Sequence, residues 1–182
     1  DRLTYYARLN LYLQSMIPPD EPTSLVFDTV EKVPLELLDA QSLGVIATTL
    51  VDRYARVAED YLERLEEDYA DSPYRSYAYY ARAYLFIAKQ DYEAARILLS
   101  RFHSESPMHP LSIQANLLYA ESLTHTAHYE TATTLLEDLL KRRDARGRPH
   151  AEALLALSSN AEAAGNIKRA VPYAQRVFNV YR

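Results

Sequence analysis

Three side chains that can bind metal ions follow one another at helical spacing. Glu121, His125 and His128 occupy positions i, i+4 and i+7, which places them along one face of a helix. Carboxylate and imidazole groups can both ligate a metal ion such as zinc or nickel, so these three side chains could form a metal site. His128, however, falls at the expected end of the helix, and the sequence places no further acid or histidine nearby. Ordinary polar surface is therefore the favoured interpretation, and we expect no metal or other cofactor.

No other pattern in the sequence indicates catalysis. The chain contains no nucleophile motif, no phosphate-binding loop and no paired carboxylates at the end of a strand. It also contains no cysteine, which removes thiol catalysis, disulfides and zinc-thiolate sites together. We therefore predict that the protein is not an enzyme.

The charge distribution argues against nucleic acid as a partner. The 182-residue chain has a formal net charge of −5 and a pI of about 5.6, whereas proteins that bind nucleic acid usually carry a basic excess. A basic run at residues 141–148 lies at the end of a predicted helix, where cations interact favourably with the helix dipole. We expect this run to be structural. No uninterrupted apolar run approaches 18 residues, so no membrane-spanning segment is predicted.

The composition favours a folded, helical protein. Hydrophobic residues make up 48% of the chain and charged residues 25%, as in soluble globular domains. Only three residues are glycine. Because β-sandwiches, barrels and nucleotide-binding α/β folds depend on glycine in their turns and loops, this scarcity favours helices.

A short pattern recurs along the chain. The segments DYEAA (91–95), HYETA (128–132) and NIKRA (166–170) align with each other, and YARVA (54–58) is a weaker copy. Their last alanines lie at 58, 95, 132 and 170, which gives spacings of 37, 37 and 38 residues. Mostly apolar residues follow four and seven positions later, so each segment begins a helix with one apolar stripe. A mostly small residue twelve positions earlier allows close approach of a partner helix. The pattern thus predicts stacked helix hairpins.

Helix-boundary residues agree with this period. Prolines lie just before the first helix of each copy, where a missing N–H costs little. Serine, aspartate or asparagine precedes several helices as a predicted N-cap, and Gly165 suits the left-handed turn that ends a helix. Pro172 falls inside the last helix, where we expect it to remove one backbone hydrogen bond. The prolines are Pro34, Pro73, Pro110 and Pro149, and the predicted caps are Ser72, Asp91 and Asn166.

These features resemble the tetratricopeptide repeat (TPR) family, with Tyr at motif position 17 (Tyr92, Tyr129) and Ala at position 20 (Ala95, Ala132). The resemblance implies an all-α fold, an α-α superhelix of antiparallel helix hairpins. It covers residues 35–182 as four repeats, at about 35–72, 73–109, 110–148 and 149–182. Residues 1–34 are expected to form N-terminal helices, as a degenerate earlier repeat. The chain departs from the family in its longer period and in bulky residues at position 27.

Residues 58–74 (AEDYLERLEEDYADSPY) resemble a narrower group. They are similar to the second helix and linker of bacterial cell-envelope TPR proteins, of the outer-membrane assembly lipoprotein and Tol–Pal coordinator type. This resemblance implies a periplasmic or cell-envelope location rather than a cytoplasmic one. No lipoprotein cysteine is present.

The family resemblance also implies a binding surface. First-helix residues line the concave face of TPR proteins and hold a peptide or helix of a partner protein. Tyrosine is abundant here, with 16 residues in the chain, and its rigid ring and hydroxyl suit binding hot spots. Packing between helices is the alternative role for these tyrosines. The partner-binding residues implied are Tyr77, Tyr80, Tyr84, Gln114, Leu117, Glu121, His125, Glu152 and Leu155.

The end of the chain indicates a second function. Val177, Phe178, Val180 and Tyr181 leave an apolar face on the last helix without a helix after it to cover it. Solenoids normally end in a polar cap. The chain is therefore expected either to continue as a longer array or to use this face for self-association, as an oligomer or spacer. A peptide-binding scaffold is the leading hypothesis, and a self-associating structural module is the alternative.

Overall fold

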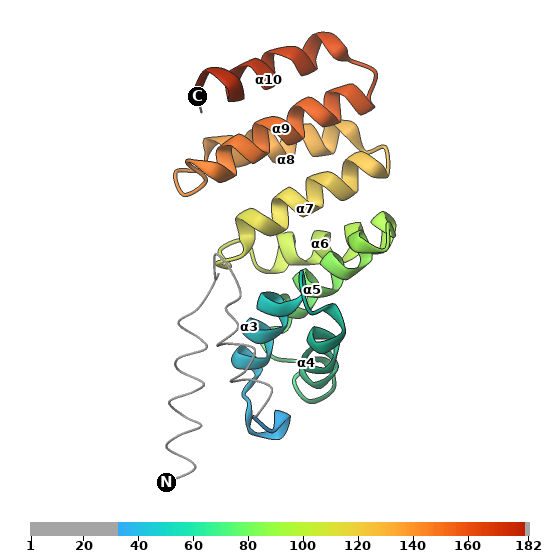
Figure 1. Ribbon diagram of the computed structural model, residues 1–182, viewed down its shortest axis with the longest axis vertical. Coiled ribbons are helices and arrows are strands. Elements are labelled where there is room, and N and C mark those ends of the chain that lie inside the picture. Colours follow the sequence, from blue (N-terminus) through green and yellow to red (C-terminus); the bar gives the residue numbers. More distant parts are fainter. Residues whose placement is uncertain (1–32, 181–182) are drawn as a thin grey trace. The chain divides into compact units, whose positions relative to one another are not determined.

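The computed structural model describes residues 33–180, in which the regular secondary structure is helical and no strand occurs (Figure 1). This confirms the predicted all-α class. After a 3-10 turn, η1 (Leu35–Leu37), the α-helices are α3 (Ala40–Leu50), α4 (Ala55–Asp68), α5 (Arg75–Ala88), α6 (Tyr92–Glu105), α7 (Ser112–His125), α8 (Tyr129–Lys141), α9 (Arg148–Ala163) and α10 (Ile167–Val180). The predicted N-terminal helices of residues 1–34 lie almost wholly outside the described residues.

Local sequence accounts for where several helices begin. The carboxylate of Asp91 accepts a hydrogen bond from the Ala94 amide at 3.1 Å and so caps α6, as predicted. The side chain of Asn166 accepts from the Arg169 amide at 3.2 Å at the start of α10. Gly165, just before it, has φ of +75°, the left-handed conformation that favours glycine.

One predicted cap is wrong. Ser72 accepts a hydrogen bond from the Tyr74 amide, but α5 begins only at Arg75. Ser72 therefore stabilises the turn that precedes the helix and does not cap its first turn.

The chain divides into two compact units, with the boundary after Leu85 and so within α5. This boundary falls inside the second predicted repeat. The described part of the first unit contains α3, α4 and most of α5. Gly44 of α3 lies against Tyr77 of α5, so closely that a Cβ on Gly44 would be 2.7 Å from the Tyr77 Cβ. The Arg82 guanidinium of α5 bonds both carboxylate oxygens of Glu66 on α4.

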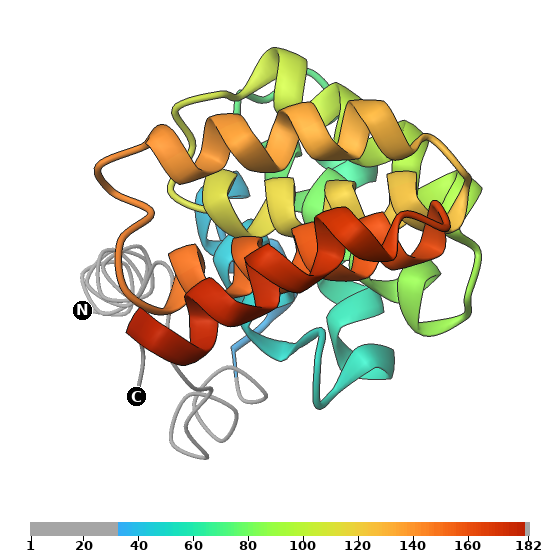
Figure 2. The same ribbon diagram turned by 90° about the horizontal axis from the view of Figure 1, so that it is seen from above.

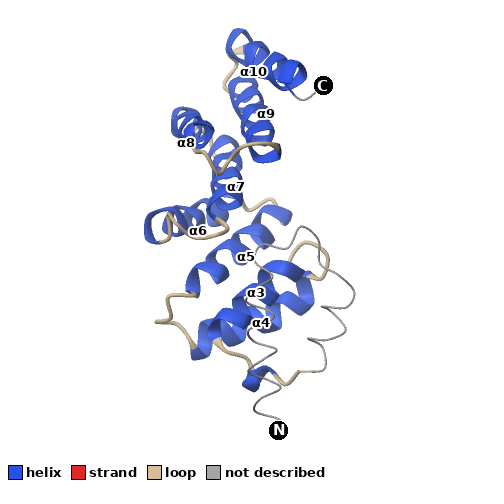
Figure 3. Ribbon diagram, turned by 90° about the vertical axis from the view of Figure 1, so that its left-hand side faces the viewer, coloured by secondary structure: helices blue, strands red, loops and turns tan. Residues whose placement is uncertain are grey.

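In the second unit, the helices from α6 to α10 stack on one another, and each is antiparallel to the next. Within it, α7 packs against α6, α8 and α9, and α10 packs on α9. Figure 3 shows α7 and α9 on one side of this unit and α6 and α8 on the other. Alanine and leucine side chains from α7, α8 and α9 and the loop between the last two form one buried cluster. Its members are Ala120, Leu136, Leu139, Ala145, Ala153 and Leu157.

A buried asparagine joins three of these helices. Asn160 of α9 is 1% exposed. Its amide nitrogen donates to the Tyr129 carbonyl and to the Thr133 hydroxyl of α8, both at 2.9 Å. Its amide oxygen accepts from the Thr124 hydroxyl of α7, also at 2.9 Å. Because a buried amide without partners is costly, these bonds fix the relative position of α7, α8 and α9.

Candidate functional site

The first unit holds the three tyrosines of the predicted surface, and it places them differently from one another. Tyr77 is 2% exposed, so the expectation of an exposed side chain is wrong for this residue. It shares a helix face with the buried Ala81 and Leu85, and the missing side chain of Gly44 leaves space for its ring. Tyr77 therefore packs α5 against α3.

Tyr80 and Tyr84 are half-buried on α5. Burial, together with the neighbouring Tyr84 and Asp52, raises the pKa of the Tyr80 phenol to about 12. Tyr80 is thus a neutral hydroxyl at physiological pH, able to donate a hydrogen bond. Whether Tyr80 and Tyr84 contact a partner stays a prediction.

The second unit gathers four of the predicted residues around one groove between α7 and α9. The groove has a volume of about 400 Å³. Leu117, Glu121 and His125 contribute from α7, and Glu152 contributes from α9. The lining also includes Leu118, Thr124, Ala156 and Ser159.

The remaining two predicted residues do not line this groove. Leu155 of α9 is 49% exposed, and Gln114 of α7 is half-buried, with its amide oxygen buried and without a hydrogen bond. Helical spacing explains the difference for Leu155. Glu152, Ala156 and Ser159 occupy i, i+4 and i+7 and share one face, whereas Leu155 lies at the edge of that face.

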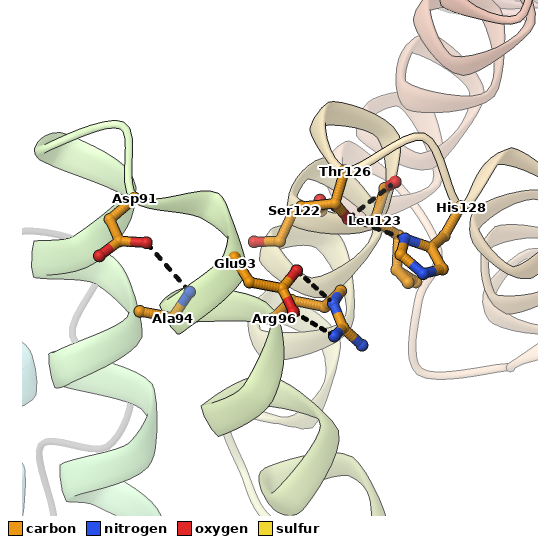
Figure 4. A network of polar contacts seen from close by, with 8 residues as sticks. All are labelled: Asp91, Glu93, Ala94, Arg96, Ser122, Leu123, Thr126 and His128. Atoms are coloured by element: carbon orange, nitrogen blue, oxygen red, sulfur yellow. Dashed lines mark hydrogen bonds and ion pairs between the residues drawn. The ribbon is translucent and has the colours of Figure 1, made fainter.

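His125 is held at the end of the groove by an aromatic stack. Its imidazole lies against the Tyr92 ring of α6, with ring centroids 3.9 Å apart and planes 8° from parallel. Figure 4 shows the adjoining polar contacts, in which Asp91 caps α6 and the Thr126 hydroxyl donates to the Ser122 carbonyl at the end of α7. The stack on Tyr92 is the contact that sets the position of His125 relative to α6.

The three metal-capable residues of the sequence do not come together. His125 stacks on Tyr92, whereas His128 lies beyond α7 with its Nδ1 3.0 Å from the Thr126 hydroxyl. Among residues 33–180, no group of three or more histidine, aspartate or glutamate side chains is placed to hold a metal ion. Within the same range, no helix is both long and apolar enough to cross a membrane.

Comparison with known proteins identifies the fold. No family model and no curated protein matches the sequence. Two solved structures do match. The one named "MamA AMB-1 C2221" has a TM-score of 0.67 at 16% identity, covering 98% of this chain and 98% of that chain. The other, "MamA AMB-1 P212121", has a TM-score of 0.63 at 16% identity, covering 98% of this chain and 91% of that one.

The chain has a TPR-like helical-repeat fold. At 16% identity the likeness to MamA shows the fold alone, although it extends over nearly the whole length of both chains. The narrower resemblance of residues 58–74 to cell-envelope TPR proteins has no counterpart in these comparisons and stays a prediction.

A second hollow of about 400 Å³ lies between α6 and α8, with α7 as its floor, and the sequence did not indicate it. His103 and Asn116 meet in it, with the His103 Nδ1 2.8 Å from the Asn116 amide oxygen. The Arg142 guanidinium donates to the Ser112 hydroxyl at 3.0 Å and pairs with Asp144. Because these polar groups already bond one another, the hollow offers fewer groups to a partner than the groove between α7 and α9.

Proposed function

We propose that this protein is an interaction scaffold that binds a peptide or helix of a partner protein in the groove between α7 and α9. The observation that carries this proposal is the convergence of Leu117, Glu121, His125 and Glu152 on one hollow of about 400 Å³. Ligand sites in proteins are concave and mostly apolar, with a few convergent polar groups. The leucines and Ala156 supply the apolar part, and the carboxylates and imidazole supply the polar part.

Display of random dodecapeptides tests this proposal. The library is selected in parallel on the full chain and on Ser159→Trp, whose bulky neutral side chain would fill the groove from an exposed position. The matched control is Ile97→Trp, at an exposed position of α6 that is 47% accessible. We expect peptides that bind the original chain and the control but not Ser159→Trp. Selection of no such peptides would refute a peptide-binding groove.

The sequence resemblance of residues 58–74 supports a bacterial envelope assembly as the setting for this scaffold. Fractionation of the source cells tests the setting separately from the binding. Recovery of the protein with periplasmic or membrane fractions is the expected result. Recovery in the cytoplasmic fraction would contradict the envelope setting and would leave the groove proposal intact.

A specific observation favours self-association as a second candidate function. Ile167, Val171 and Phe178 of α10 are 66%, 47% and 60% exposed, and their spacing places them on one stripe. In Figure 2, α10 lies at the near end of the second unit. The opposite edge of the same helix packs inward through Ala170 and Tyr173.

Sedimentation velocity over a wide range of concentration tests this candidate. We expect concentration-dependent association that Val171→Glu combined with Phe178→Glu abolishes. The matched control is Gln175→Glu combined with Asn179→Glu, which adds the same two acidic side chains at exposed polar positions of α10. A monomer at all concentrations would exclude this candidate.

A further inference from the structure

Among the described residues, the lining of the groove between α7 and α9 contains acidic side chains and no lysine or arginine to balance them. The two carboxylates are those of Glu121 and Glu152. Glu152 pairs with Arg148, whose Nε is 2.8 Å from a Glu152 oxygen. Its side chain is 90% exposed, and an ion pair held in water in this way is weak. A cation from a partner can therefore replace it at little cost.

The Thr124 hydroxyl in the lining of the groove is not available as a donor to a partner. Thr124 has one hydroxyl proton, and both the Ala120 carbonyl and the Asn160 amide oxygen lie 2.9 Å from its oxygen. Polar recognition of a partner thus falls to Glu121, Glu152, Ser159 and the exposed His125. The ionised carboxylates accept hydrogen bonds and cannot donate them. The groove accordingly favours a partner that brings donors and positive charge.

Desolvation explains why other partners are disfavoured. A neutral or acidic segment that covers the groove would remove water from two carboxylates without replacing the hydrogen bonds, and such unpaired charges are costly. A lysine or arginine removes that cost, and the stem of its side chain can pack on Leu117, Leu118 and Ala156. Arginine also suits the site because its planar guanidinium can bond a carboxylate through two N–H groups.

From these observations, and resting on the proposed function, we propose that the groove between α7 and α9 selects a partner segment that carries a lysine or arginine, which Glu121 and Glu152 bind. The basic side chain enters the groove, and an apolar neighbour in the same segment covers the leucines. The partner is thus a basic peptide segment.

The peptides selected in the display experiment above provide the probes. Peptides that bind the original chain but not the Ser159→Trp variant form the groove-dependent set. We expect this set to contain more lysine and arginine than the starting library. Their affinity, measured by fluorescence anisotropy on the full chain, should fall about tenfold or more on Glu121→Gln combined with Glu152→Gln, as expected for loss of close charge pairs. Higher salt should weaken binding to the original chain more than binding to this variant.

The control variant removes two acidic charges elsewhere. Glu63→Gln combined with Glu67→Gln alters exposed residues of α4 and should leave the affinity unchanged. A groove-dependent set without excess lysine or arginine, or one that binds the Glu121/Glu152 variant as tightly as the original chain, would overturn this inference and leave the scaffold function standing. An empty groove-dependent set would overturn both. If the original chain forms concentration-dependent dimers and the Glu121/Glu152 variant does not, the occupant of the groove is a second copy of this chain. That result would overturn the proposal that a separate basic partner binds there.

Discussion

Replacing Asn160 with alanine tests whether one buried amide holds α7, α8 and α9 together. The side chain is 1% exposed and makes three hydrogen bonds, two to α8 and one to α7. Each net bond is worth about 1 kcal/mol, and a buried cavity adds to the loss, so we expect the free energy of unfolding to fall by about 2–4 kcal/mol. The lower part of this range is favoured because the groups left behind keep other bonds: the Thr124 hydroxyl can still donate to Ala120.

Asn116 provides a matched comparison for this prediction. It lies on α7, is 8% exposed, and its side-chain amide oxygen lies 2.8 Å from the His103 Nδ1. Asn116→Ala should therefore cost only about 1 kcal/mol. Urea denaturation followed by far-UV circular dichroism measures both variants. If Asn160→Ala lowers the free energy of unfolding no more than Asn116→Ala does, the argument that Asn160 joins the three helices is refuted.

Three further predictions follow from single positions. Gly44→Ala should lower the urea midpoint, because the new Cβ would lie 2.7 Å from the Tyr77 Cβ, and overpacking of this kind costs about 1–3 kcal/mol; a raised midpoint would contradict this. Burial lowers the pKa of His109 to about 4 from its usual 6.5. Between these two values the unfolded chain binds a proton that the folded chain does not, so the free energy of unfolding is highest above pH 6.5 and falls as the pH approaches 4. The urea midpoint of His109→Asn should therefore fall less than that of the original chain between pH 7 and pH 4.5, and equal falls would refute the assignment. Pro172→Ala should raise the thermal midpoint, because it restores a backbone donor for the Lys168 carbonyl inside α10; an unchanged or lower midpoint would show that the proline costs nothing there.

The all-α class and the helix order could be predicted because they depend on local signals that repeat. The alanine at the start of each second helix, Asp91 and Asn166 as caps, and Gly165 in a left-handed turn all act within a few residues of the chain. Because stacked helical repeats carry the same sequence pattern in each copy, one period read from the sequence predicts several helices at once.

The position of individual side chains could not be predicted in the same way. Tyr77 falls at a motif position that lines the concave face of TPR proteins, yet it is buried because Gly44 on another helix leaves space for its ring. That space depends on two residues 33 positions apart (77 − 44) and on how closely α3 approaches α5. A motif read within one repeat contains no information on such a pair.

Asn160 shows the same limit in a polar residue. Its sequence position within an apolar register of α9 could have indicated a buried polar role. Its partners, however, are a backbone carbonyl and two threonines on other helices. The hollow between α6 and α8 is similarly built from residues of three helices, and no single helix pattern predicts it.

The packing of α7 explains why the groove residues can determine binding without determining the fold. Three helices surround α7, and its buried side chains, among them Ala120 and Leu123, meet these neighbours. On the side of the groove, a face of α7 that includes Leu117, Glu121 and His125 remains open. The backbone positions of this face are fixed by the packing beneath it, whereas Glu121 and His125 are themselves exposed. A change of charge at Glu121 should therefore alter which partner binds and leave the stability of the second unit within about 0.5 kcal/mol of its original value.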